Sequence, residues 1–268
     1  MNRSIGLLSV VLFAGFPLMA QQPSVGALSV ALEAEAGSVA TPKGVVAYRL
    51  YSPEPIEAGR RYPLVLFLHG SGERGTNNTA QLKFGVRDIL KWGKVFGEPM
   101  FLLAPQCPPG RKWVEVAWDR RIHPMPKEPS DPMRGVVAAL EKVCRECPVD
   151  PSRIYLTGLS MGGYGSWDLL SRKPGFFAAA LPVCGSGDPA QAGRMTRTPI
   201  WAVHGMRDSA VPVDHSAAMV EAIRRAGGRL ALFHAIPGAP HDVWSRTYSN
   251  PMALRWLFEQ RNPTPPSF

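Results

Sequence analysis

Ser160 lies in a sequence setting that is typical of catalytic nucleophiles. Residues 158–162 read Gly-Leu-Ser-Met-Gly, after an apolar stretch at 154–157 that predicts a buried strand and before residues that can continue as a helix. A strand, a Gly-x-Ser-x-Gly turn and a helix form a nucleophile elbow, which exposes the serine oxygen above a sheet. Glycine is expected at both ends of the motif because side chains there would clash in so tight a turn. The alternative is a glycine-rich turn that packs a helix closely or binds phosphate.

An acid and a base follow the serine in the chain. Asp208 lies four residues after a predicted strand that ends at His204, and His241 lies in the loop after the last predicted strand. Histidine can take the serine proton because its unperturbed pKa of about 6.5 lies near neutral pH. A carboxylate beside it fixes the imidazole tautomer and stabilises the imidazolium. Because the carboxyl ends of parallel strands share one edge of a sheet, Ser160, Asp208 and His241 are expected to meet there as nucleophile, acid and base.

Other residues of the same types are less well placed for these roles. The remaining histidines are expected in turns, a helix, a strand or a long loop: His69, His123, His204, His215 and His234. His69 and His204 each precede a glycine at a strand end, where they are expected to shape the turn. Asp214 is expected to cap the helix that follows it, and Asp242 is the other alternative to Asp208.

A glycine-rich loop follows the clearest buried strand, which begins at Pro63 and is apolar almost throughout. Residues 69–75 read His-Gly-Ser-Gly-Glu-Arg-Gly. A flexible loop at this position exposes backbone N–H groups above the sheet edge, where they can bind negative charge that develops on a substrate oxygen. The other donor of such an oxyanion hole is the N–H of the residue after the nucleophile, here Met161.

Predicted strands and helices alternate along the chain, which favours a mostly parallel sheet with helices on both faces. There is no internal repeat and no interdomain linker, so a single α/β domain is expected over residues 21–268. Strands are expected at residues 29–34, 45–51, 63–70, 99–104, 154–157, 177–183, 198–204 and 230–236, with a turn at 37–44. Helices are expected at residues 81–92, 133–147, 163–170, 214–226 and 251–261.

The irregular stretch at residues 108–132 contains six prolines and two tryptophans, Trp113 and Trp118. A loop of this length in a compact domain is usually functional. The two tryptophans therefore predict a wall or partial cap at the substrate site, which Trp244, close to His241 in the sequence, would also line. The alternative is that the loop tryptophans anchor the loop to the body of the domain.

The composition excludes several classes of protein. Apolar residues make up 45% of the 268 residues, enough for a sizeable core, and charged residues at 19% are too few for a disordered chain or a coiled coil. The formal net charge is +9, but the lysines and arginines are scattered and not interleaved with aromatic residues, so no nucleic-acid partner is expected. The positive charge is consistent with a basic cell-envelope surface or with attraction to acidic substrates.

The first 20 residues are typical of a secretory signal peptide. Arg3 supplies a positive start, residues 5–16 are apolar and uncharged, and Ala20 is a small residue at a predicted cleavage site. The apolar run is too short to favour a membrane span. No cysteine follows the cleavage site, so no lipoprotein anchor and no stable membrane attachment are expected. We therefore expect a periplasmic or secreted protein.

The four cysteines do not have the spacing of a metal site. Cys144 and Cys147 lie three residues apart, but a zinc site would need a second pair at similar spacing, which the sequence lacks. Buried free thiols are expected for Cys107 and Cys184, each of which follows an apolar strand. Cys144 and Cys147 could pair with each other or stay free.

Four segments together resemble the α/β-hydrolase superfamily: residues 69–75, 158–163, 204–208 and 241–244. The resemblance covers residues 48–259 and is greatest to a branch of secreted predicted peptidases and esterases. That branch lies near the polyhydroxybutyrate-depolymerase-like and feruloyl esterases, and the chain is also similar to the phospholipase/carboxylesterase group. The resemblance implies an α/β-hydrolase fold with an eight-stranded sheet, possibly one strand short, and catalysis without a cofactor or metal. It also implies the triad Ser160, Asp208 and His241, with oxyanion donors at Met161 and Ser71 and with Gly72 as the alternative to Ser71.

The expected function is that of a secreted serine carboxylesterase. Ser160 would form an acyl-enzyme with a small-molecule or polymeric ester, and Trp113, Trp118 and Trp244 would line the entrance. One alternative is a serine peptidase of the same fold. Another is a non-catalytic carbohydrate-binding or structural protein on a hydrolase scaffold, although an intact set of serine, acid and histidine argues against it.

Overall fold

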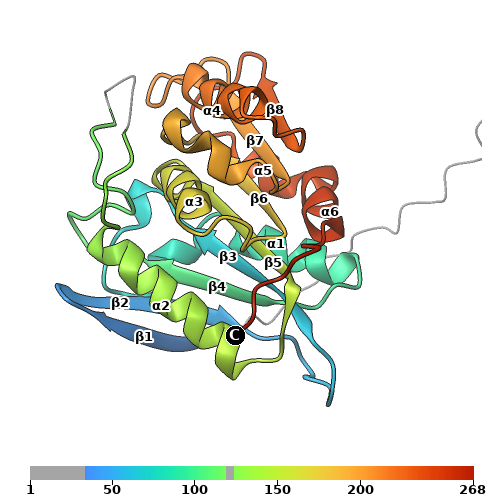
Figure 1. Ribbon diagram of the computed structural model, residues 1–268. Helices are drawn as coiled ribbons and strands as arrows, with labels where there is room; N and C mark the ends of the chain where they lie inside the picture. The colour runs from blue at the N-terminus through green and yellow to red at the C-terminus, as the bar shows by residue number, and fades with distance from the viewer. Residues whose placement is uncertain (1–33, 119–123) are drawn as a thin grey trace, which may run out of the picture. The chain divides into compact units, whose positions relative to one another are not determined.

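An eight-stranded sheet organises the part of the chain that the computed structural model describes, residues 34–118 and 124–268 (Figure 1). The strands are β1 (Glu35–Thr41), β2 (Gly44–Tyr51), β3 (Tyr62–Leu68), β4 (Phe101–Gln106), β5 (Val149–Leu159), β6 (Ala179–Val183), β7 (Ile200–Gly205) and β8 (Ala231–Ile236). Their order across the sheet is β1-β2-β4-β3-β5-β6-β7-β8. β2 pairs antiparallel with both β1 and β4, and the pairs from β4 through β8 are parallel.

Helices cover both faces of this sheet. They are α1 (Val86–Val95), α2 (Asp131–Glu146), α3 (Met161–Arg172), α4 (Val213–Arg225), α5 (Trp244–Ser249) and α6 (Pro251–Glu259). Residues of α2, α3 and α4 cluster with Leu64 and Leu66 of β3. Residues of α1, α5 and α6 cluster with Val65 and Phe67 of the same strand. Because successive side chains of a strand point to opposite faces, a strand covered on both sides is apolar at every position, as β3 is.

The expected α/β architecture with a mostly parallel sheet is confirmed. Several elements differ from the sequence prediction: α5 was not predicted, and β5 begins five residues earlier than expected. The predicted first strand lies largely outside the described residues, and β1 instead occupies most of the predicted turn, pairing with β2 from Glu35↔Leu50 to Thr41↔Gly44. This edge strand has mostly exposed or half-buried side chains, so it lacks the apolar pattern that marks buried strands. The helix predicted from residue 81 begins only at Val86, because Gly85 has a φ of +75° and interrupts it.

The predicted signal peptide, residues 1–20, lies outside the described residues. Among the residues that the structure describes, none of the helices is long and apolar enough to cross a membrane.

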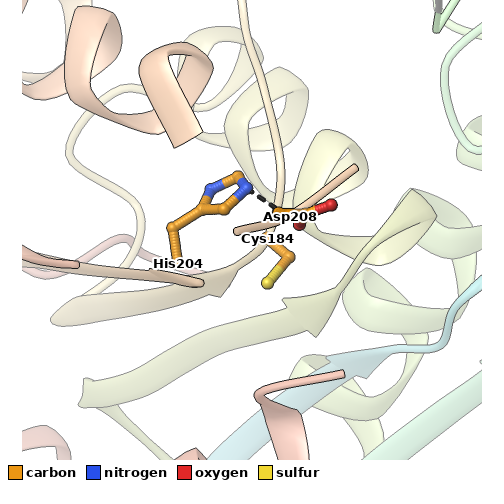
Figure 2. Close-up of side chains that lie close together, drawn as sticks. All are labelled: Cys184, His204 and Asp208. Atoms are coloured by element: carbon orange, nitrogen blue, oxygen red, sulfur yellow. Dashed lines mark ion pairs between the residues drawn. The ribbon is translucent and has the colours of Figure 1, made fainter. Parts of the chain in front are cut away.

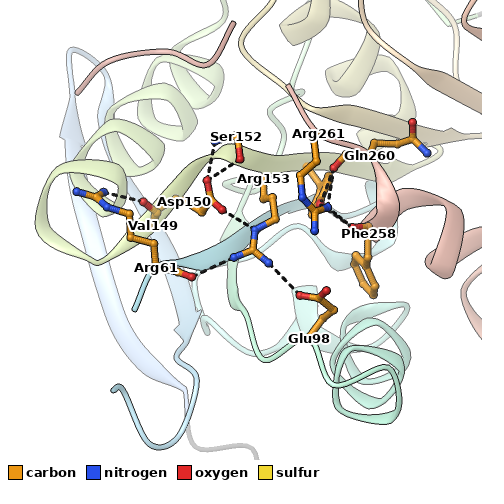
Figure 3. A network of polar contacts seen from close by, with 10 residues as sticks. Arg61, Glu98, Val149, Asp150, Ser152, Arg153, Phe258, Gln260 and Arg261 are labelled. Atoms are coloured by element: carbon orange, nitrogen blue, oxygen red, sulfur yellow. Dashed lines mark hydrogen bonds and ion pairs between the residues drawn. The ribbon is translucent and has the colours of Figure 1, made fainter. Parts of the chain in front are cut away.

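A polar network holds the N-terminal end of β5, at the edge of the sheet away from Ser160 (Figure 3). The Arg153 guanidinium lies 2.6 Å from Asp150, 3.0 Å from Glu98 and 3.0 Å from the carbonyl oxygen of Arg61. Asp150 also accepts hydrogen bonds from the N–H and hydroxyl of Ser152. Partial burial acts to raise the pKa of Asp150, but the bonds from Ser152 and Arg153 outweigh it and lower the pKa below its ordinary value of 3.8.

The depressed pKa makes a pH-dependent contribution to stability. We expect Asp150→Asn to lower the free energy of unfolding by about 1–2 kcal/mol at pH 7, where the carboxylate is charged. A group with a lowered folded-state pKa stabilises the fold above its unfolded pKa and loses that effect as the pH falls. The difference between variant and wild type should therefore shrink below about pH 4 in urea unfolding.

The matched control is Glu57→Gln, which removes an exposed ion pair with Arg60 and should change stability by less than about 0.5 kcal/mol. A deficit of Asp150→Asn that stays constant or grows on acidification would contradict this account.

Candidate active site

Ser160 occupies the sharp turn between β5 and α3. Its φ of +52° and ψ of −115° form a backbone conformation that residues with side chains rarely adopt. The Ser160 N–H donates to the carbonyl oxygen of Val183 at the end of β6, with an N–O distance of 2.9 Å, which holds the turn against the neighbouring strand. The predicted strand–turn–helix setting of the serine is therefore present.

The glycines of the motif are required by close backbone contacts. A Cβ atom added at Gly162 would lie 1.9 Å from the carbonyl oxygen of Leu68, the last residue of β3. A Cβ at Gly158 would lie 2.5 Å from the carbonyl oxygen of Gly162. Both distances are far below van der Waals contact, so only glycine allows the elbow to lie directly against β3. The same contact brings the loop after β3 next to the N-terminus of α3.

The structure brings Ser160, His241 and Asp208 together in one hydrogen-bonded chain. His241 Nε2 lies 2.9 Å from the Ser160 hydroxyl oxygen, and His241 Nδ1 lies 2.6 Å from Asp208 Oδ2. The histidine side chain is 23% exposed, whereas the carboxylate is completely buried. With Nδ1 donating to the carboxylate, Nε2 is free to accept the serine proton, which is the arrangement that a general base requires.

Asp208 is a buried charge with donors on both of its oxygens. Oδ1 accepts the N–H groups of Ala210 and Val211 at 2.9 and 2.8 Å. Oδ2 accepts from His241 and also lies 3.1 Å from His204 Nε2. Burial acts to raise the pKa of Asp208, but the hydrogen bonds from His204, His241 and Val211 outweigh it and hold the pKa well below its usual range. The carboxylate therefore stays ionised at neutral pH.

Cys184, His204 and Asp208 form a compact group whose ligand atoms lie within 4.8 Å of one another (Figure 2). Their hydrogen bonds argue against a metal site. The Cys184 thiol donates to the carbonyl oxygen of His241 at 3.2 Å, and burial raises the pKa of this thiol to about 12. A thiol held in its protonated form is a poor metal ligand. Cys184 and His204 instead support the triad, by contacts to the His241 carbonyl and to the Asp208 carboxylate.

The two predicted oxyanion donors are available for a ligand. Met161 is the first residue of α3, so its N–H has no acceptor within the helix. Ser71 begins a short 3-10 turn in the loop after β3. In the described part of the chain, neither N–H donates to a backbone carbonyl of another element. Their role in binding an oxyanion stays a prediction.

His69 holds the loop after β3 in place, as expected of a residue that shapes the turn. Its Nε2 accepts the N–H of Cys107 at 2.9 Å, and its Nδ1 donates to the carbonyl oxygen of Gly70 at 2.6 Å. Burial lowers the pKa of His69 to about 4, so the ring is neutral and its proton stays on Nδ1. Both ring nitrogens of His69 are engaged in hydrogen bonds, so neither is free to act as the base.

The tryptophan prediction is wrong for Trp113. This side chain is completely buried, its indole N–H donates to the carbonyl oxygen of His69 at 3.0 Å, and its ring packs edge-on against the His69 ring. It anchors the loop to the body of the domain, which was the alternative, because the carbonyl at the end of β3 needs a buried donor. Trp113 therefore lines no substrate entrance.

Trp118 and Trp244 are both half-buried. The Trp118 ring lies 6.3 Å from the ring of Tyr164, and the Lys112 ammonium lies 4.4 Å from its centre. The Trp244 ring meets the His241 ring edge-on, with centroids 5.3 Å apart. Trp244 thus borders the triad, and contact of either tryptophan with a substrate stays a prediction.

The sequence reasoning missed the contact between His204 and Asp208. The only signal available was their spacing of four residues across a tight turn, which does not by itself indicate that the side chains meet.

Comparisons with known proteins agree with this geometry. The Dienelactone hydrolase family profile matches residues 117–249, a range that includes Ser160, Asp208 and His241. A solved thermostable esterase is 37% identical with a TM-score of 0.77, over 85% of this chain and 63% of its own. The chain has the α/β-hydrolase fold, which the esterase neighbour shares.

Two further proteins resemble this chain to different degrees. A probable carboxylesterase of Oryza sativa subsp. japonica is 27% identical over 76% of this chain and 80% of its own. The Pyrococcus horikoshii acylaminoacyl peptidase shares the fold, with 14% identity and a TM-score of 0.64 over 88% of this chain. The chain spans 63% of the esterase chain and 43% of the peptidase chain. Together the similarities support the expected carboxylesterase-type hydrolase.

The contact at Gly162 predicts an intolerance to any side chain. We expect Gly162→Ala to lower the free energy of unfolding by more than about 2 kcal/mol, because the clash is with backbone that cannot move aside. The control is Gly72→Ala in the loop after β3, where a Cβ meets nothing within 4 Å. Its unfolding free energy should stay within about 0.5 kcal/mol of wild type in denaturant titration. Equal stability of the two variants would contradict the steric explanation.

Proposed function

We propose that this α/β-hydrolase is a serine esterase that cleaves carboxylic ester bonds through an acyl-enzyme. The observation that carries the proposal is the chain of contacts from Ser160 through His241 to Asp208, at 2.9 and 2.6 Å. Two further features support the proposal, the strained backbone at Ser160 and the free N–H of Met161. Sites for acyl transfer typically have both, a nucleophile on a strained turn and an N–H donor directly after it.

Each residue has a defined role in the proposed reaction. Ser160 Oγ attacks the ester carbonyl carbon while His241 Nε2 takes the hydroxyl proton, and the N–H groups of Met161 and Ser71 bind the oxyanion. The tetrahedral intermediate expels the alcohol, which receives the proton from His241, and the acyl group stays on Ser160. Water then attacks the acyl-enzyme with His241 again as the base, releasing the acid and restoring the serine. Asp208 stabilises the imidazolium in both steps, and the sequence of steps uses no cofactor.

Esters are favoured over amides as substrates. The thermostable esterase at 37% identity and the rice carboxylesterase support an ester substrate, whereas the acylaminoacyl peptidase shares only the fold. We propose small-molecule or polymeric carboxylic esters as the substrate class, including feruloyl and polyester substrates. Trp244 is placed to contact such a substrate because its ring lies against His241 and is half-buried.

The serine is the residue whose removal tests the proposal. Wild type is expected to hydrolyse p-nitrophenyl acetate, and Ser160→Ala is expected to lose at least about 10³-fold in kcat because no other group supplies the nucleophile. Ser249→Ala, which removes an exposed hydroxyl on α5, is the control and should leave the rate unchanged.

Retained turnover in Ser160→Ala would overturn the mechanism. Hydrolysis of an acylaminoacyl amide by the wild type, with no hydrolysis of the ester of the same acyl group, would favour the peptidase alternative.

We also propose that the protein is exported and that residues 1–20 are removed. The support is the positive Arg3, the uncharged apolar stretch at 5–16 and the small Ala20. Expression in a bacterial host followed by N-terminal sequencing of the periplasmic and secreted fractions should give Gln21 as the first residue. A chain that keeps Met1 and stays in the cytoplasmic fraction would contradict export.

A further inference from the structure

A second histidine contacts the carboxylate of the triad. His204, at the end of β7, is completely buried, and its Nε2 lies 3.1 Å from the same Asp208 oxygen that accepts from His241. Figure 2 shows the His204 ring directed at this carboxylate. We propose that His204 is a positioning residue, which donates its Nε2 proton to Asp208 and so fixes the carboxylate that orients the catalytic base. The inference rests on the proposed esterase function.

The protonation of His204 follows from its partners. Nε2 lies 2.8 Å from the carbonyl oxygen of Val211 as well as 3.1 Å from Asp208 Oδ2. A carbonyl and a carboxylate can only accept hydrogen bonds, so Nε2 must carry a proton. Nδ1 lies 2.8 Å from the hydroxyl of Ser216, which also lies 2.9 Å from the carbonyl oxygen of Gly185. The ring is thus held from both sides, and its one Nε2 proton is shared between the Val211 carbonyl and the Asp208 carboxylate.

Val211 connects the two groups in a closed arrangement. Its carbonyl accepts from His204 Nε2, and its N–H donates to Asp208 Oδ1 at 2.8 Å. One oxygen of Asp208 is therefore fixed by backbone N–H groups, and the other by two imidazoles. The second imidazole matters because a completely buried carboxylate needs donors to offset the loss of water.

His204 should affect the chemical step more than substrate binding. His204 is completely buried and contacts Asp208, which in turn contacts His241. His204 can therefore affect the reaction only through the orientation of Asp208 and His241. Small errors in the position of catalytic groups reduce the rate of the chemical step steeply. A loss of the His204 donor should therefore lower kcat and leave KM nearly unchanged.

Two amide substitutions distinguish the loss of the N–H donor to Asp208 from the loss of the imidazole ring as such. In His204→Gln the side-chain amide can reach the position of Nε2 and keep an N–H donor to Asp208. In His204→Asn the shorter amide reaches only the position of Nδ1. With p-nitrophenyl acetate we expect His204→Asn to lose about 10- to 100-fold in kcat, with KM within about 2-fold, and His204→Gln to stay within about 3-fold of wild type. Equal losses in both variants, or none in either, would overturn the proposal.

A spectroscopic measurement tests the inference without any substrate. The proton between His241 Nδ1 and Asp208 Oδ2, at 2.6 Å, should give a far-downfield proton NMR resonance in wild type and in His204→Gln. The resonance should broaden or move upfield in His204→Asn; an unchanged resonance there would overturn the inference. If wild type shows no esterase activity, the proposed function fails while this test of His204 still stands.

A second variant covers the case in which His204→Asn does not fold. Ser216→Ala removes the hydroxyl that holds Nδ1 and keeps the ring itself. A several-fold lower kcat at unchanged KM is expected, with a shifted downfield resonance. A wild-type kcat together with a wild-type resonance would overturn the positioning role.

Discussion

The structure depends on the close approach of two backbone segments, the elbow after β5 and the end of β3. Gly162 lies so near the carbonyl oxygen of Leu68 that a Cβ would come within 1.9 Å of it. This contact places the nucleophile turn and the glycine-rich loop side by side, so that the N–H groups of both can face one substrate oxygen. The contact is possible because the fully buried β3 pairs in parallel with β5, which brings both strand ends to one edge of the sheet.

A second constraint is the burial of charge beneath the serine. The Asp208 side chain has no exposed surface, so its ionised form depends on the hydrogen bonds that reach both oxygens from two backbone N–H groups and two imidazoles. The chain provides these donors locally, because the tight turn between β7 and α4 brings Val211 and Ala210 back onto the carboxylate. The Cys184 thiol lies in the same group of side chains and stays protonated, so it adds no second negative charge beside Asp208.

The sequence predicted the parts of the fold and site that follow from strong local patterns. A strand that is apolar at every position, such as β3, indicates burial on both faces, and the glycine spacing around Ser160 indicates a tight turn. The chain order of serine, acid and histidine located the triad that the structure assembles. The exposed strand β1 lacked an apolar pattern, and α1 is shortened by a backbone angle at Gly85. The role of Trp113 was misjudged and the contact of His204 with Asp208 was missed, because both depend on which backbone or carboxylate group the side chain meets, and spacing alone does not determine that.

The central claim is that His241 and Asp208 activate Ser160 as a nucleophile. It is tested most directly by treating the protein with a fluorophosphonate probe and locating the covalent adduct by peptide mass spectrometry. The account predicts a single adduct on Ser160 in wild type, and little or none in His241→Ala, in which the base is missing. An adduct on another residue, or equal labelling of Ser160 in both proteins, would contradict it.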